Sequence, residues 1–165
     1  MRALVAAASR HGATHEIAEA IAAGLARRGV EAEARHAEGL ASIDGYDALV
    51  LGSAVYVGRW LEPARDLVET HAKALAAMPV WLFSSGPLGS PEALKPEGDP
   101  VDVDALMDTA QAVEHRVFAG RLDRKLLGFG EKALVVAVRA PEGDFRDWEA
   151  IDAFAGEIAE RLQRG

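Results

Sequence analysis

Three short segments of small and polar residues carry the chemistry that this sequence can offer. The first, residues 9–14, reads Ser-Arg-His-Gly-Ala-Thr and leads from an apolar run into a helical pattern. Backbone N–H groups at a helix start have no intrahelical partner, and the helix dipole adds positive potential there. The hydroxyls of Ser9 and Thr14 are further donors, and Gly12 lets the backbone approach a ligand closely. These features indicate a phosphate site. Arg10 either adds positive charge to this site or points to solvent.

The order of residues in this 9–14 loop limits which kinds of phosphate ligand it can bind. It matches neither the G-x-x-x-x-G-K-[ST] pattern of nucleoside triphosphatases nor the G-x-G-x-x-G pattern of dinucleotide folds. It also contains no carboxylate, so a phospho-acceptor site fits poorly. Two interpretations remain. The loop binds a monophosphate ligand, or it is an ordinary strand-to-helix turn with Thr14 as the N-cap.

The two other segments favour a flat ring. Residues 52–60 read Gly-Ser-Ala-Val-Tyr-Val-Gly-Arg-Trp, so small residues that permit backbone contact are followed by two aromatics. Tyr56 is the better candidate for stacking on a heterocycle, because Trp60 is expected to pack in the core at a helix start. Residues 84–89 read Ser-Ser-Gly-Pro-Leu-Gly. Their amides and hydroxyls suit the polar edge of a ring, although glycine and proline also build plain surface turns.

Alternating strands and helices are predicted to position these segments. Continuous apolar runs, typical of parallel strands buried on both faces, occupy residues 3–8, 48–51 and 80–83. Further strands are expected at 30–36 and 114–119, and helices at about 14–27, 61–77, 103–110 and 148–162. This alternation predicts one α/β domain over residues 1–165, with a doubly wound parallel sheet and helices on both faces. Ligands of such sheets bind at the carboxyl ends of the strands, where all three segments lie.

Composition excludes several classes of protein. The 165 residues include no cysteine, which rules out disulfides, thiolate metal sites and a cysteine nucleophile. The net charge of −8 argues against nucleic acid as a partner, because phosphate contacts need clustered lysine and arginine. None of the five histidines forms a pair at metal-ligand spacing with carboxylate support, since His11 and His15, at i and i+4, straddle the loop and the helix start, so no metal site is expected. No apolar run is long enough for a membrane helix, and a cytoplasmic location is expected.

The three segments, together with residues 139–148 (Arg-Ala-Pro-Glu-Gly-Asp-Phe-Arg-Asp-Trp), resemble flavodoxin-domain proteins related to the menaquinone-dependent protoporphyrinogen oxidase family. The resemblance spans nearly the whole chain. It implies a flavodoxin-like five-stranded sheet in the order 2-1-3-4-5 and non-covalently bound FMN. By motif position, it places the phosphate on Ser9, Arg10, His11, Gly12, Ala13 and Thr14, and the ring between Ser53, Ala54, Val55, Tyr56, Val57 and Gly58 on one side and Ser84, Ser85, Gly86, Pro87, Leu88 and Gly89 on the other.

The resemblance implies electron transfer, with the reaction left open between two hypotheses. Arg10 and His11 stand where a plain flavodoxin is richer in Thr and Ser, which favours an oxidoreductase that couples a small, protoporphyrinogen-like donor to a quinone. On this hypothesis the 121–147 segment, which is partly apolar, contacts a hydrophobic substrate or the inner face of a membrane. The alternative is a non-enzymatic carrier whose acidic surface docks a basic protein partner. A flavin-free binding module on the same fold is a third possibility.

Overall fold

A parallel sheet forms the centre of the molecule. The computed structural model describes residues 1–56, 58–86, 102–123, 125, 128 and 142–165. The sheet has the order β2-β1-β3-β5-β6, which is 2-1-3-4-5 when its parallel strands are counted along the chain, and this confirms the predicted order. The elements are β1 (Arg2–Ala8), α1 (Ala13–Arg27), β2 (Glu31–His36), β3 (Ala48–Tyr56), β4 (Arg59–Trp60), α2 (Glu62–Leu75), β5 (Val80–Gly86), α3 (Val103–Ala110), β6 (Glu114–Ala119), β7 (Arg121–Leu122), β8 (Gly143–Asp144) and α5 (Trp148–Arg164).

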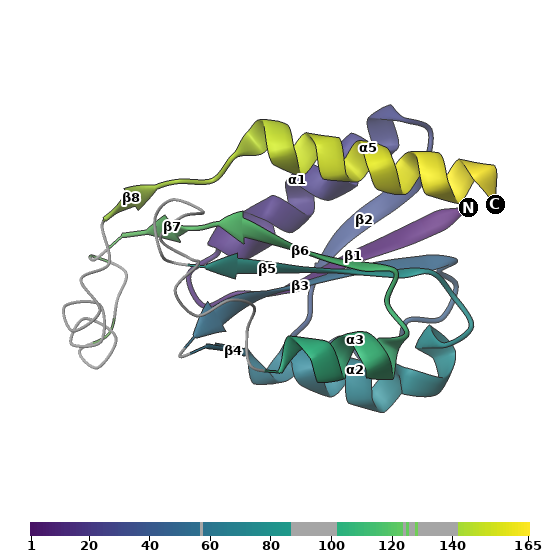
Figure 1. Cartoon of the computed structure of the whole chain (residues 1–165), viewed down its shortest axis with the longest axis horizontal. Helices are drawn as coiled ribbons and strands as arrows, with labels where there is room; N and C mark the ends of the chain where they lie inside the picture. Colours follow the sequence, from purple (N-terminus) through teal and green to yellow (C-terminus); the bar gives the residue numbers. More distant parts are fainter. Residues whose placement is uncertain (57, 87–101, 124, 126–127, 129–141) are drawn as a thin grey trace.

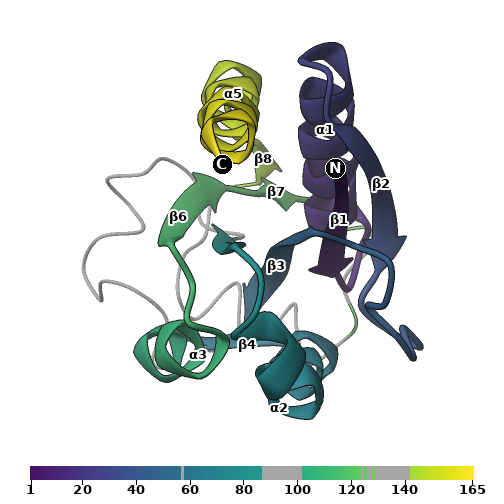
Figure 2. The same cartoon turned by 90° about the vertical axis from the view of Figure 1, so that its right-hand side faces the viewer.

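Helices cover both faces of this sheet. Figures 1 and 2 show α1 and α5 on one face and α2 and α3 on the other. Side chains of β1 alternate between the two layers: Ala3 and Val5 pack with α1 and α5, whereas Leu4 and Ala6 pack with α2. Because both faces are covered, β1 reads in the sequence as a continuous apolar run, as predicted.

The register of the central strands brings the three candidate segments to one edge of the sheet. Ala8, the residue before the 9–14 loop, pairs with Ser53 of β3. Ser53 in turn pairs with Ser84 of β5. The carboxyl ends of β1, β3 and β5 therefore lie side by side, at the end of the sheet where the arrows of β3 and β5 point in Figure 1.

Two strands extend further than the apolar runs predict. The prediction ends the central strand at residue 51, but β3 continues to Tyr56 and there pairs antiparallel with β4. The prediction likewise ends the next strand at residue 83, but β5 continues to Gly86. Backbone pairing does not depend on apolar side chains, and neighbouring strands hold both extensions in the ladder. Ser53 to Tyr56 and Ser84 to Gly86 are thus strand residues, and the predicted strand ends at residues 51 and 83 are wrong.

After β6 the chain forms a short antiparallel pair, β7 with β8, that the sequence pattern does not predict. Arg121 pairs with Asp144, and the N–H of Phe145 donates to the carbonyl of Gly120 at 3.0 Å. Figure 1 shows this pair beyond the carboxyl end of the sheet, before the chain returns through α5. Most of the apolar part of the 121–147 segment lies outside the described residues. In the described part of the chain, no helix combines the length and the apolar character needed to cross a membrane.

Candidate functional site

The 9–14 loop turns the chain from β1 into α1 around a glycine. Gly12 is the N-cap of α1 and has a φ of +86°, a left-handed conformation that side chains other than glycine rarely adopt. Its N–H donates to the hydroxyl of Ser9 at 3.0 Å, which closes the turn. Thr14 lies inside the helix and is buried, so the alternative that made it the N-cap is wrong.

The start of α1 is suited to an anion. No side chain among the described residues caps the helix, and its N-cap residue is a glycine. The first N–H groups of an uncapped helix are donors for a ligand or for water, and the helix dipole favours negative charge there. The guanidinium of Arg10 lies over the ring of Tyr56, 4.2 Å from its centroid. This contact places a cation between the 9–14 loop and the end of β3, although Arg10 as a residue is exposed.

The two central strands use their serine hydroxyls within the protein. Ser53 is fully buried, and its hydroxyl accepts from the N–H of Leu61 at 2.9 Å, at the start of α2. The hydroxyl of Ser84, also fully buried, accepts from the indole Nε1 of Trp60 at 2.7 Å and lies 2.7 Å from Nε2 of His115. Trp60 is buried, as predicted for core packing. Both hydroxyls therefore have partners within the protein.

The remaining candidates lie around the same edge. Ala54, Val55, Tyr56 and Gly58 are half-buried, whereas Ser85 and Gly86 are buried in β5. Val57, Pro87, Leu88 and Gly89 lie outside the described residues. The structure thus gathers the described candidates at the ends of three neighbouring strands.

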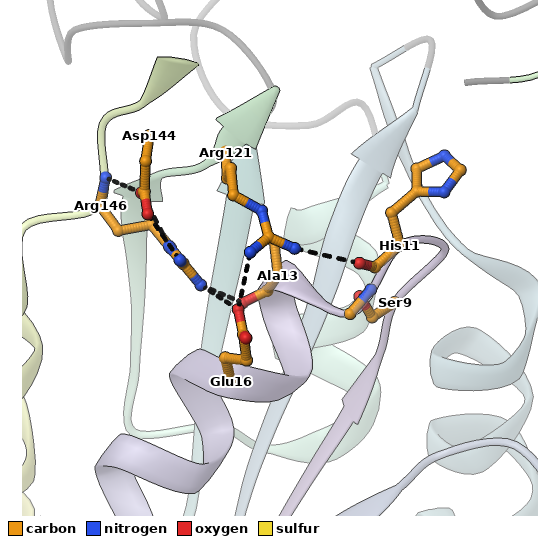
Figure 3. Close-up of polar contacts among 8 residues, drawn as sticks. Ser9, His11, Ala13, Glu16, Arg121, Asp144 and Arg146 are labelled. Atoms are coloured by element: carbon orange, nitrogen blue, oxygen red, sulfur yellow. Dashed lines mark hydrogen bonds and ion pairs between the residues drawn. The ribbon is translucent and has the colours of Figure 1, made fainter. Parts of the chain in front are cut away.

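Two arginines that the sequence does not single out flank the 9–14 loop (Figure 3). Arg121, on β7, donates to the carbonyl of His11 at 3.3 Å and pairs with Glu16 at 3.3 Å. Arg146, just after β8, donates to the same carboxylate at 2.5 Å and to the carbonyl of Ala13 at 3.4 Å. The only signal for Arg146 in the sequence is its place in the 139–148 motif that carries the family resemblance.

The side chain of Arg146 is held from several directions. Its Nε and Nη2 donate to the two oxygens of Asp144 at 2.9 and 2.6 Å, and its guanidinium lies 4.6 Å from the ring centroid of Trp148. The hydrogen bonds to Arg146 hold the pKa of Asp144 below its ordinary value, and the same contacts raise the pKa of Arg146. Both groups therefore stay charged near neutral pH.

A pair of histidines lies beside the start of α1. The rings of His15 and His36 stack with centroids 3.7 Å apart and planes 13° apart. Burial, and after it the charge of His36, lowers the pKa of His15, while Glu19 opposes this shift. Among the residues that the structure describes, no group of three potential ligands is arranged to hold a metal ion.

Fold and site together define an α/β protein of the flavodoxin type, with an uncapped helix start at the first strand-to-helix turn. Comparison with known proteins agrees: the model of the flavodoxin domain family matches residues 4–149, and the chain belongs to this family. Similar solved structures are a flavodoxin from the domain Archaea, at 17% identity with a TM-score of 0.65 and 99% of both chains covered, and the flavodoxin of Streptococcus pneumonia TIGR4, at 18% identity with a TM-score of 0.63 and 98% of this chain and 99% of that chain covered.

The comparison of sequences also confirms the resemblance to proteins related to the protoporphyrinogen oxidase family. Protoporphyrinogen IX dehydrogenase [quinone] of Escherichia coli (strain K12) is 24% identical over 172 residues, covering 96% of this chain and 95% of that protein.

Proposed function

We propose that this protein binds FMN, with the phosphate on the 9–14 loop and the ring between the ends of β3 and β5, and that it transfers electrons. The observation that carries the proposal is the start of α1: it has no side-chain cap, it turns on a glycine, and Arg10 of the loop and Arg121 beside it bring positive charge near. A phosphate dianion suits such a site. Bound FMN would supply the redox chemistry, and the protein would bind and orient it.

The expected contacts of the flavin ring are the polar groups at the strand ends whose hydrogen bonds are not already used within the protein. The hydroxyls of Ser53 and Ser84 already have partners within the protein. Backbone groups at the strand ends and the half-buried Tyr56 are therefore the expected contacts of the ring. Arg10, which now covers the ring of Tyr56, is expected to move when a flavin stacks there.

Titration of the flavin-stripped protein with FMN tests the proposal. We expect the visible absorption of FMN to shift and its fluorescence to change on binding, and riboflavin to bind more weakly because it lacks the phosphate. A protein that is purified colourless and changes neither signal would refute the proposal and favour a flavin-free module.

For the reaction, we propose that the protein couples a porphyrinogen-like or other small donor to a quinone. The similarity over 96% of the chain to a quinone-linked protoporphyrinogen IX dehydrogenase supports this. In the overall reaction the donor loses two electrons and two protons, and the quinone gains them to become a hydroquinone. Anaerobic assays with the donor and with a water-soluble quinone test the two halves separately. Reduced protein that is reoxidised by protein acceptors alone would refute a quinone reaction.

The acidic charge favours the second candidate, a carrier that docks a basic redox protein. A net charge of −8 would steer such a partner, and added salt would screen the attraction. Exchange with a basic reductase should then slow as ionic strength rises. Rates that do not depend on salt would count against the carrier.

A further inference from the structure

We infer that Arg121 and Arg146 form a clamp that sets the affinity of the 9–14 loop for a phosphate monoester. This arginine clamp (Arg121 and Arg146) rests on the proposed function, because it concerns the same phosphate site. The two residues are positioning residues: they hydrogen-bond to carbonyl groups of the loop and are not proposed to contact the ligand.

The clamp determines which way the loop's peptide groups face. Arg121 holds the carbonyl of His11, and Arg146 holds the carbonyl of Ala13 (Figure 3). In a trans peptide the C=O and the following N–H point in opposite directions. The N–H groups of Gly12 and Thr14 are therefore directed away from the clamp, and that of Gly12 reaches the hydroxyl of Ser9.

The loop needs such support because its glycine is unconstrained by packing. A Cβ placed on Gly12 would have no atom within 4 Å, so packing does not restrict its φ and ψ. Its N–H donates to the hydroxyl of Ser9, and its carbonyl accepts from the N–H of Glu16. Glycine also has the widest conformational freedom of any residue. Hydrogen bonds on the carbonyls at both sides of Gly12 restrict this freedom before a ligand arrives, which lowers the cost of binding.

The clamp also neutralises a carboxylate that would repel a phosphate. Glu16 lies in the first turn of α1, and both arginines pair with its Oε2. Together with Asp144, the four side chains carry no net charge. Loss of either arginine leaves this group with a charge of −1 beside the 9–14 loop, and a dianion would then bind less well.

Arg146 is already ordered by its own surroundings. Only 6% of its side chain is exposed, and the fork to Asp144 and the ring of Trp148 hold the guanidinium in place. Such a preorganised guanidinium loses little further entropy when it acts on the loop. Through Arg146, the 139–148 motif near the C-terminus thus supports the 9–14 loop near the N-terminus.

The test compares FMN with riboflavin, which shares the ring and lacks the phosphate. Dissociation constants of both flavins are measured for the full chain and for Arg146→Met and Arg121→Met, with folding checked by circular dichroism. For each variant we expect FMN affinity to fall about tenfold and riboflavin affinity to change less than about twofold. Glu16→Gln added to Arg146→Met should restore part of the FMN affinity, because it removes the uncompensated carboxylate.

Arg28→Met is the matched control. Arg28 has the same kinds of contact farther along α1, with the carbonyl of Gly24 at 3.0 Å and the carboxylate of Asp152 at 2.9 and 2.7 Å. Its removal should leave the ratio of FMN to riboflavin affinity unchanged. Equal losses for both flavins in the clamp variants, or no loss for either, would overturn the clamp.

Inorganic phosphate separates failure of the clamp from failure of the proposed function. If the wild-type chain binds no flavin but phosphate raises its melting temperature, the proposed function fails. The clamp still stands if the rise is smaller in Arg146→Met than in Arg28→Met, and it falls if the two rises are equal. If neither flavin nor phosphate binds, both proposals fail.

Discussion

Replacing Ser84 with alanine should destabilise the fold more than it weakens flavin binding. Ser84 stands among the predicted ring contacts, but its hydroxyl joins Trp60 on β4 to His115 on β6, with both distances 2.7 Å. Ser84 is fully buried and Trp60 is 2% exposed, so bulk water cannot readily replace the lost acceptor. The substitution therefore leaves the indole N–H buried without its partner.

The size of the effect follows from this orphaned donor. A buried polar group that loses its partner costs about 1–3 kcal/mol. Removing a hydroxyl leaves little empty volume, and half-buried His115 can regain some hydration. We therefore expect the free energy of unfolding to fall by about 2 kcal/mol. In a Trp60→Phe background no indole donor remains, and Ser84→Ala should then cost only about 0.5–1 kcal/mol.

A double-mutant cycle in urea measures the difference. Unfolding of the wild type, both single variants and the double variant is followed by far-UV circular dichroism, and the coupling should be about 1–1.5 kcal/mol. Ser42→Ala is the control, because this exposed serine accepts from the N–H of neighbouring Asp44. It should change stability by less than about 0.5 kcal/mol. The dependence on urea should be alike in all variants, which shows that the same unfolding is compared.

Two results would refute the reasoning. Additive effects of the two substitutions, within about 0.5 kcal/mol, would mean that the bond between Trp60 and Ser84 contributes nothing specific. An FMN dissociation constant that rises more than about threefold in Ser84→Ala, with stability unchanged, would assign the hydroxyl to the ligand instead.

Three further predictions concern the sheet, the loop and the histidine pair. Gly52→Ala should cost about 1–3 kcal/mol in urea unfolding, because its Cβ would lie 2.0 Å from Cζ of Phe83. Gly12→Ala should cost about 1 kcal/mol and weaken FMN more than riboflavin, because φ is +86° in the loop proposed to hold the phosphate. Because the pKa of His15 lies below its ordinary 6.5, the unfolded chain binds the proton more readily, and stability should fall as the pH drops below 6.5. His15→Phe, which keeps a ring against His36, should flatten this loss in melting temperatures measured between about pH 7.5 and 5.5.

The order of strands and helices was predictable because each element carries its own local signal. The run at residues 3–8 is apolar throughout since β1 is covered on both faces. The helix over Trp148–Arg164 has Ile151, Phe154 and Ile158 at helical spacing, and all three are buried against the sheet. Such periodicity is a property of neighbouring residues, so it can be recognised without knowing what packs against them.

The ends of the central strands were not predictable in the same way. Ser53, Ser84 and Gly86 have the composition of a loop, and only their partners in adjacent strands and the cover of Trp60 keep them in the sheet. Arg121 and Arg146 were missed for the same reason. Each lies more than a hundred residues from the carbonyl that it holds, and no local pattern signals such a pairing.

The last helix and the proposed phosphate site depend on one stretch of chain. Asp147 caps α5 by accepting from the N–H of Ala150 at 3.0 Å, while its neighbour Arg146 holds the 9–14 loop. Docking of α5 against α1 thus helps to position Arg146, whose guanidinium lies over Trp148 at the start of α5. By linkage, a phosphate that binds better to the clamped loop must stabilise the docked helix by the same free energy. Protection of the α5 amides from hydrogen exchange should therefore rise with FMN in the wild type and rise less in Arg146→Met.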